Sequence, residues 1–270
     1  MATRFLGRVD PSRLGSLVLT AALVGLFAGL CAATFGRIAG EPAIRDAIAI
    51  EEANAAAAGD ADVDGEHTGG HDAEEASVSR ADQSGIGLFG AYSITGAAFG
   101  ALLGLVTHGL RRGRPEIQRR VYLAGAILAG GFTLGPWFKY PPNPPAVGDP
   151  DTLARRQSLY VAMICITIGV GLVATIVARR LRAMGWDEHR RIPAVVASVV
   201  VPLGLAVGLL PPAPDPITVP ATLLWRFRVA SLGGNLTMWV VLTLGVAWVA
   251  TEAVRRRADE HSAPVAAGVA

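Results

Sequence analysis

Residues 135–152 of the chain read Gly-Pro-Trp-Phe-Lys-Tyr-Pro-Pro-Asn-Pro-Pro-Ala-Val-Gly-Asp-Pro-Asp-Thr, and six of these eighteen residues are proline. Proline fixes the backbone φ angle and has no amide hydrogen, so a helix that enters this stretch from either side must end there. The stretch nevertheless carries two carboxylates, an amide, a phenol and the only lysine of the sequence. We interpret it as a structured cap between two membrane-spanning helices, at one mouth of a transport path.

The apolar residues, which make up 51% of the 270 residues, are gathered into six blocks. Each block has about the 17–25 residues that a helix needs to cross the hydrocarbon core of a bilayer, and charged side chains are nearly absent from it. The blocks are Gly15–Phe35, Ile86–Leu110, Val121–Phe138, Leu159–Ala178, Ile192–Leu210 and Val229–Ala250. The sequence therefore predicts an all-α integral membrane protein with six transmembrane helices, folded as a single membrane domain over residues 1–270.

The positions of the arginines predict the orientation of these helices. Sixteen of the 24 basic residues lie before the first block, between the second and third, between the fourth and fifth, or after the sixth. Because basic segments stay on the cytoplasmic side, we expect both termini in the cytoplasm and the protein in the cytoplasmic membrane, with the lipid bilayer as a partner. The basic residues are divided among separate short segments, so nucleic acid is not an expected partner.

The segment between the first two blocks, residues 39–85, is predicted to be an acidic, partly disordered extracytoplasmic insertion. Residues 39–86 hold twelve acidic and two basic residues, a net charge of −10 that leaves +12 on the rest of the chain. Residues 43–58 favour a helix that continues the first block beyond the membrane. Residues 59–85 are poor in apolar side chains and rich in Gly and Asp, a composition typical of disordered chain.

Two histidines lie four residues apart in this insertion, His67 and His71, surrounded by carboxylates. Imidazole and carboxylate groups suit a borderline divalent ion such as Co²⁺, Ni²⁺ or Zn²⁺. The pair forms a bidentate site only if the segment becomes helical. The alternative is a solvated acidic linker that carries two incidental histidines.

Four polar residues in or beside the first cap, which we define as residues 141–150, are further candidate metal ligands: Tyr140, Asn143, Asp149 and Asp151. Asp151 is also placed to cap the N-terminus of the fourth helix, with Thr152 as the alternative capping residue. Capping competes with metal binding at Asp151. Asp149 has no comparable structural role that its position predicts.

A short motif recurs seventy residues apart in the second half of the chain. Pro150-x-Thr152-Leu153-x-x-Arg156 is repeated as Pro220-x-Thr222-Leu223-x-x-Arg226. The second copy follows another proline-rich connection, residues 211–220, which we call the second cap. The spacing suggests parallel hairpin repeats, an arrangement from which transporter folds are often built. Chance enrichment in proline is the alternative explanation.

Arg156 and Arg226 fall near the outer ends of the fourth and sixth helices, where an arginine must reach water or find a partner. We expect their partners to be Asp149 or Asp151 and Asp215. Such ion pairs would have a structural or gating role between the hairpins and would not bind a cation directly.

Glycine and proline inside the blocks predict local features of the helices. Small residues recur at helix-packing spacing at Gly25 and Gly29, at Gly96, Gly100 and Gly104, and at Gly204 and Gly208, which predicts close approach of helix backbones. Pro202 in the fifth block is expected to kink its helix, either as a hinge or coordinating break or through packing alone.

Several functional classes find no support in the sequence. The lysine of a phosphate-binding loop precedes Ser or Thr, whereas Lys139 precedes Tyr140. Neither a G-x-S-x-G nor an H-E-x-x-H motif is present. No block contains a carboxylate of the kind that a proton relay requires. We therefore expect neither an enzyme nor a bound cofactor.

The first cap and its flanks, residues 139–152, resemble the signature of the CbtA family, the probable cobalt transporter subunit. Gly40-Glu41-Pro42 after the first block and residues 220–233 add to this resemblance, which covers nearly the whole chain apart from its termini. The resemblance implies uptake of Co²⁺ in the context of cobalamin synthesis. It also implies a partner, a small CbtB subunit with one span and a histidine-rich tail. The outer segment here has only two histidines, a departure that bears on metal capture by that segment.

The sequence thus leads to one main hypothesis and two alternatives. The main hypothesis is a six-span transporter subunit that admits Co²⁺ from outside, with the acidic insertion concentrating ions and the two caps forming an outer vestibule. The alternatives are a non-conducting accessory or assembly protein, and a channel for another divalent cation or a small solute.

Overall fold

The computed structural model describes residues 10–59, 83–110, 116–145 and 147–266. Every regular element within these ranges is a helix. Six helical stretches are long and apolar enough to cross a membrane: Leu14–Asn54, Gly85–Gly109, Ile117–Lys139, Leu153–Ala183, Glu188–Leu209 and Ala221–Asp259. Each stretch overlaps one of the six predicted blocks, so the prediction of an all-α chain with six potential spans is confirmed.

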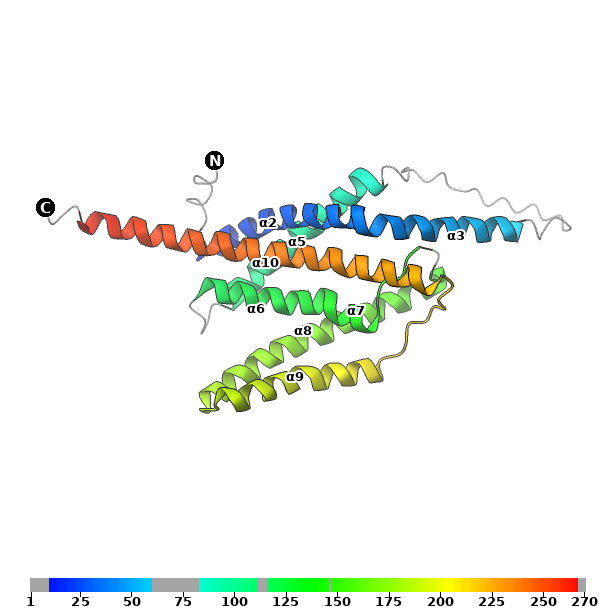
Figure 1. Ribbon diagram of the computed structural model, residues 1–270. Coiled ribbons are helices and arrows are strands. Elements are labelled where there is room, and N and C mark those ends of the chain that lie inside the picture. The colour runs from blue at the N-terminus through cyan, green and yellow to red at the C-terminus, as the bar shows by residue number, and fades with distance from the viewer. Residues whose placement is uncertain (1–9, 60–82, 111–115, 146, 267–270) are drawn as a thin grey trace.

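The first of these stretches is one continuous helical rod. Helix α2 (Leu14–Phe35) passes through a π-helical turn, η1 (Gly36–Gly40), into α3 (Glu41–Gly59), and α3 extends beyond the other helices (Figure 1). The predicted continuation of the first block is therefore confirmed. The remaining helices and turns are η2 (Gln83–Gly87), α5 (Leu88–Gly109), α6 (Ile117–Ala129), η3 (Gly130–Leu134), α7 (Gly135–Lys139), η4 (Pro150–Thr152), α8 (Leu153–Ala183), α9 (Glu188–Leu209) and α10 (Ala221–Ala266).

Helices α2 and α5 pack with their backbones in contact because glycine lines the interface. A Cβ atom added to Gly25 or Gly29 of α2 would collide with backbone carbonyls of α5, and one added to Gly96 or Gly100 of α5 would collide with those of α2. This arrangement confirms the close packing predicted from the glycine spacing in these two helices. The same prediction is wrong for Gly204 and Gly208 of the fifth block, where an added Cβ would meet nothing within 4 Å. Without a hydrophobic driving force in lipid, such close van der Waals contact is a main source of helix association.

Helices α6 and α10 complete the core around this pair. The buried cluster includes Val121 of α6 and Leu242 of α10. Phe99 of α5 stacks between Phe132 of η3 and Trp239 of α10, with ring centroids 5.0 and 4.9 Å apart. The Trp239 indole N–H donates to the Thr133 hydroxyl at 2.9 Å, so this buried aromatic cluster contains no unsatisfied indole donor.

The α8–α9 hairpin lies at the side of this core. Helix α9 packs mainly on α8, and most of its residues are exposed. A largely apolar groove of about 790 Å³ is lined by residues of α6, α7, α8 and α9. Helix α9 continues through both Pro193 and Pro202, and the kink expected at Pro202 stays a prediction.

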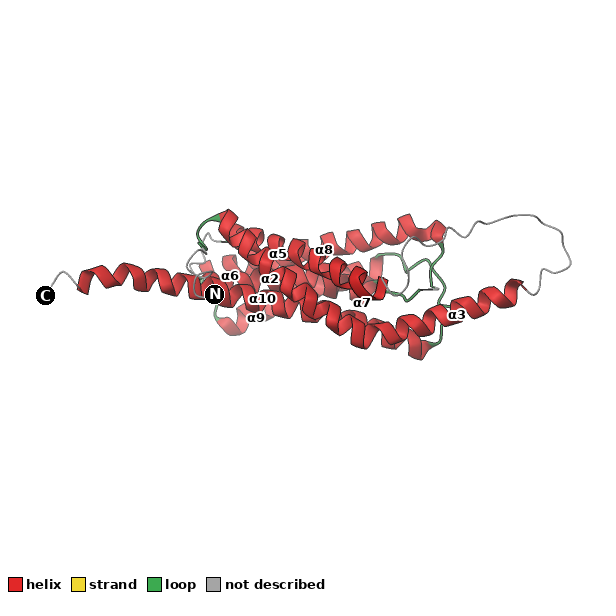
Figure 2. Ribbon diagram, turned by 90° about the horizontal axis from the view of Figure 1, so that it is seen from above, coloured by secondary structure: helices red, strands yellow, loops and turns green. Residues whose placement is uncertain are grey.

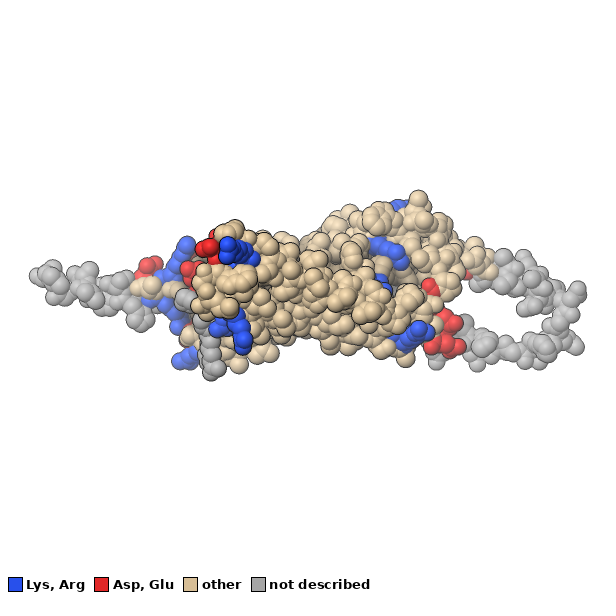
Figure 3. Space-filling model, turned by 90° about the horizontal axis from the view of Figure 1, so that it is seen from below, with Lys and Arg blue, Asp and Glu red and all other residues tan. Residues whose placement is uncertain are grey.

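Charged side chains gather at the two ends of the molecule, with an uncharged band between them (Figure 3). The start of α2 and the end of α10 lie at the same end, as an even number of spans requires, and α10 extends past the other helices there (Figures 1 and 2). We call this the arginine-rich end, because Arg13, Arg120 and Arg255–Arg257 belong to it. The opposite, proline-rich end carries α3 and both caps.

We predict that Gly96→Ala destabilises the folded protein by about 1–3 kcal/mol, because the new methyl group forces apart two backbones that are in contact. Unfolding of the purified protein in mixed micelles, followed by circular dichroism against denaturant, measures this difference. The matched control is Gly204→Ala in α9, where an added Cβ meets nothing within 4 Å. An equal effect of the two substitutions would contradict the glycine interface.

Candidate functional site

The two caps pack directly on each other at the proline-rich end. The Lys139 ammonium, next to the first cap, donates to the Val207 carbonyl at 2.7 Å, and the Tyr140 hydroxyl donates to the Pro211 carbonyl at 2.8 Å. In a continuing helix the Val207 carbonyl would accept from residue 211, which is proline and has no N–H. Lys139 therefore supplies the donor that α9 lacks at its end, and the same contact joins α7 to α9.

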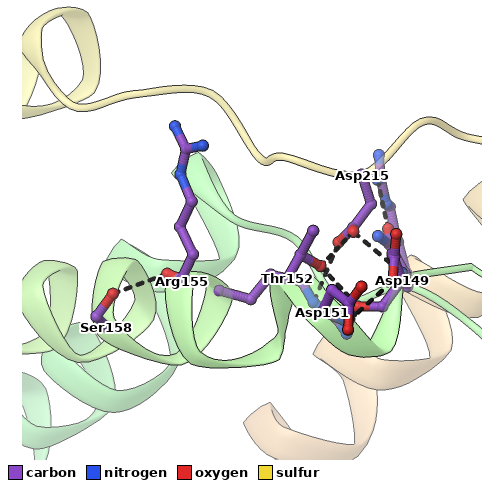
Figure 4. A network of polar contacts seen from close by, with 9 residues as sticks. Asp149, Asp151, Thr152, Arg155, Ser158 and Asp215 are labelled. Atoms are coloured by element: carbon purple, nitrogen blue, oxygen red, sulfur yellow. Dashed lines mark hydrogen bonds and ion pairs between the residues drawn. The ribbon is translucent and has the colours of Figure 1, made fainter.

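The carboxylate of Asp215, in the second cap, is the centre of the contact between the caps. Its side chain is 0% exposed. One oxygen accepts hydrogen bonds from the Thr152 hydroxyl at 2.5 Å and from the Asp149 amide at 3.2 Å (Figure 4). The other oxygen lies 3.1 Å from Nε of Arg156. Asp215 is thus bound by an amide of the first cap, by the hydroxyl of Thr152 and by the guanidinium of Arg156 in α8.

The Arg156 guanidinium binds the backbone of the first cap in addition to the carboxylate of Asp215. Its Nη2 donates to the Asp149 carbonyl at 3.2 Å. Gly148 has a φ of +134°, which L side chains rarely adopt, and a Cβ atom there would lie 2.5 Å from Nη1 of Arg156. Only glycine therefore allows the chain to turn this closely around the guanidinium. Asp215, the observed partner of Arg156, is one of the predicted partners.

The surroundings shift the pKa of two groups in this region. The Thr152 hydroxyl, chiefly, with the Asp149 amide and the Arg156 charge, holds the pKa of Asp215 below its ordinary value of 3.8, although burial acts in the opposite direction. Burial raises the pKa of the Tyr140 phenol. Asp215 is therefore ionised and Tyr140 is a neutral hydrogen-bond donor at neutral pH.

The residue that caps the start of the fourth predicted helix is not Asp151, as the sequence predicted, but Asp149. The carboxylate of Asp149, not that of Asp151, accepts a backbone N–H, from residue 151 at 2.9 Å. Thr152 occupies the N-cap position of α8 without a capping bond from its side chain. The physical reason is the 3₁₀ turn Pro150–Thr152, which begins the helical path three residues earlier and moves the capping role to Asp149. Asp151 stays exposed at the surface of the cap.

Arg226 pairs with Asp46 of α3 at 3.1 Å, so the expectation that it would bind Asp149, Asp151 or Asp215 is wrong. The reason is the extension of the first helix: α3 runs alongside the start of α10 and brings Asp46 opposite Arg226. A second buried cluster accompanies this contact, formed by Ala43, Ala47, Val147, Val219, Leu223 and Leu224. The first helix is thereby packed against both caps.

A cavity of about 480 Å³ lies between the caps and the start of α8. Among its lining residues are Tyr140, Asn143, Arg156, Gln157, Tyr160 and Asp215. The Asn143 carbonyl oxygen accepts a hydrogen bond from Nη2 of Arg228 at 3.0 Å. Oxygen atoms that could meet a hard cation are thus present around this cavity, and in this closed arrangement two of them, on Asn143 and Asp215, are bound to arginine.

The structure brings together only part of the predicted metal set. Tyr140, Asn143, Asp149 and Asp151 lie in or beside the first cap, whereas His67 and His71 lie outside the described residues. Among the residues that the structure describes, no group of three or more His, Cys, Asp or Glu side chains is close enough to hold a metal ion.

Sequence reasoning missed Glu41. Its side chain is 5% exposed and lies 3.5 Å from Arg45, inside the first stretch that can span a membrane. Glu41 lies beyond the predicted block Gly15–Phe35, so the expectation that no block contains a carboxylate is unchanged. Its position directly after the apolar block, between Gly40 and Pro42, was the available signal, and it was assigned to the acidic insertion instead.

The chain is similar to one known protein family. A family model described as CbtA, probable cobalt transporter subunit, matches residues 14–251. The matched range begins at the first residue of α2 and includes both caps. Neither a curated protein nor a solved structure matches the chain.

We predict that Asp215→Asn lowers the unfolding temperature of the detergent-solubilised protein at neutral pH, because Arg156 loses its buried counterion. Since the pKa of Asp215 is lowered in the folded state, its carboxylate stabilises the protein fully above pH 3.8 and progressively less as the pH falls through the folded-state pKa. The difference in unfolding temperature between the wild type and Asp215→Asn should therefore shrink below about pH 3.8.

The control is Asp151→Asn, which removes an exposed carboxylate from the same cap and should change the unfolding temperature little at any pH. A difference between wild type and Asp215→Asn that persists unchanged at the lowest pH would contradict the assigned role of the carboxylate.

Proposed function

The chain belongs to the CbtA family of probable cobalt transporter subunits, and we propose that it is the membrane subunit of a Co²⁺ uptake system in the cell membrane. The proposal follows the family in linking this uptake to cobalamin synthesis. Both termini then face the cytoplasm, in keeping with the arginine-rich end, and the proline-rich end faces outward.

The observation that supports this proposal most strongly is the cavity between the caps. Simple connections between helices would need no buried ion pair, yet here Asp215, Thr152 and Arg156 organise two proline-rich segments around a space of about 480 Å³ at the end of the bundle. Such a space, lined by phenol, amide and carboxylate oxygens, suits a vestibule that receives a cation with part of its water shell.

Negative charge around this vestibule would raise the local concentration of Co²⁺. Asp149 and Asp151 are exposed on the first cap, and Asp46, Glu51 and Glu52 are exposed on α3. Acidic groups around an opening attract cations and speed their arrival. In this proposal His67 and His71 capture ions at an earlier stage, and the cap carboxylates guide them inward.

The Arg156–Asp215 ion pair would then act as a gate. While the pair is closed, the buried carboxylate is neutralised by Arg156 and offers no charge to a cation. A Co²⁺ ion that enters the vestibule competes with the guanidinium for the same carboxylate, so binding of the ion and separation of the caps become one event. Arg226 has a structural role in this scheme, because it joins α3 to α10.

Two alternatives remain as proposals. The binding of Asn143 and Asp215 by arginines favours a non-conducting accessory or assembly protein, since the closed caps satisfy their own polar groups. A channel for another divalent cation or a small solute would use the same vestibule. A small single-span subunit of the CbtB type is the proposed protein partner, and the word subunit in the family description agrees with a multi-protein assembly.

We predict that cells expressing the chain together with its proposed partner accumulate radiolabelled Co²⁺ faster than cells with an empty vector. Replacing both Asp149 and Asp151 by Asn should lower the initial rate roughly two- to tenfold at low ionic strength, because the mouth loses two charges. High salt should narrow this difference by screening. Competition by Ni²⁺ and Zn²⁺ measures selectivity.

The matched control is Asp187→Asn, an exposed aspartate at the turn between α8 and α9 at the other end of the molecule. It should leave uptake unchanged. Absence of Co²⁺ uptake by the wild type, with or without the partner, would reject the transporter and favour the accessory protein. Uptake that is insensitive to Asp149→Asn/Asp151→Asn would reject the vestibule as its entrance.

A further inference from the structure

A second polar cavity lies at the arginine-rich end, opposite the caps. Its volume is about 640 Å³. It is lined by residues from four separate parts of the chain: the turn before α2, the end of α5, the start of α6 and the last third of α10. Neither the family description nor the vestibule accounts for this cavity.

The lining of this cavity is positively charged. Arg120 of α6 and Arg255 of α10 contribute two guanidinium groups to this lining, whereas Glu116 is its only acidic residue. The neighbours Arg256 and Arg257 are engaged by Glu252 and Asp10. Arg255, in contrast, is exposed and makes no ion pair or hydrogen bond within the described part of the chain.

Two guanidinium groups facing one space favour a phosphate group. The planar fork of arginine donates two parallel N–H bonds to phosphate oxygens and keeps its charge at every physiological pH. A divalent cation is disfavoured here, because the lining carries a net positive charge and only one carboxylate. The first turn of α6, whose residue Ile117 lines the cavity, adds backbone N–H groups at the positive end of a helix dipole.

The position of the cavity along the helices agrees with the headgroup layer of a membrane. Pro11 lies three residues before the first stretch that can span a membrane, His108 lies one residue before the end of the second, and Ile117 begins the third. The cavity therefore lies where the apolar stretches end. Apolar residues, among them Pro11, Ile117 and Val254, form the rest of its lining and suit the glycerol and first methylene groups of a lipid.

We propose that this cavity binds the phosphate group of an anionic membrane phospholipid, with Arg120 and Arg255 as its ligands. Basic pockets between transmembrane helices at a membrane surface are suited to such headgroups. A bound lipid would bridge Arg120 of α6 and Arg255 of α10 at this end of the bundle. This inference stands whether or not the chain carries cobalt.

Native mass spectrometry of the detergent-purified full chain tests the proposal. With phosphatidylglycerol and phosphatidylcholine added in equal amounts, we expect the wild type to retain at least about fivefold more phosphatidylglycerol, as two charge-assisted contacts imply. The variant Arg120→Gln/Arg255→Gln should lose this preference. The control Arg119→Gln/Arg182→Gln removes the same charge from two exposed arginines outside the cavity and should keep it.

Equal retention of the two lipids by the wild type, or equal loss of preference in the double variant and in the control, would overturn the proposal. Inorganic phosphate is tested separately: if it competes at millimolar concentration and the lipids show no preference, the site takes soluble phosphate and the lipid assignment is wrong. The single variant Arg255→Gln, at an exposed position, should reduce the preference at least twofold and keeps the test decisive if the double variant fails to fold.

Discussion

The buried carboxylate of Asp215 holds together two segments that have almost no regular structure of their own. Proline removes backbone donors from both caps, so main-chain hydrogen bonds cannot fix their conformation. Side chains take over that role: Thr152, Arg156 and the Asp149 amide bind Asp215, and Lys139 and Tyr140 bind carbonyls at the end of α9. The vestibule exists because these contacts connect the two caps, and each contact crosses from one cap region to the other.

The rest of the bundle supports this arrangement. The glycine-lined contact of α2 with α5 fixes the first two spans, and the unbroken passage from α2 through η1 into α3 carries the first helix out to the caps. There, Ala43 and Ala47 pack on Val147 of the first cap and Val219 of the second. The α8–α9 hairpin touches the core less extensively, so the cap contacts are a large part of what attaches α9 to the remainder of the molecule. The residues that connect the two caps would therefore also be the residues of the proposed gate.

The sequence predicts features that depend on composition along the chain and misses those that depend on which helices are neighbours. Block length and hydropathy give all six potential spans, and glycine spacing gives the α2–α5 interface. The partners predicted for Arg156 include the observed one, Asp215, because the repeated motif suggested that the two caps face each other. The partner of Arg226 could not be predicted from the sequence, because Asp46 is 180 residues distant along the chain. The two side chains meet only because α3 lies beside α10. The capping role of Asp149 was missed because no sequence signal placed the 3₁₀ turn at Pro150.

We expect Arg156 and Asp215 to act as one interaction that joins the caps. A double-mutant cycle tests it most directly, with the unfolding temperature measured for the wild type, Arg156→Gln, Asp215→Asn and the combined variant. Strong non-additivity is expected: the combined variant should lose no more stability than the more damaging single substitution, because each substitution already removes the shared contact. Losses that simply add would show that the two side chains act independently, and would contradict a joint role in closing the vestibule.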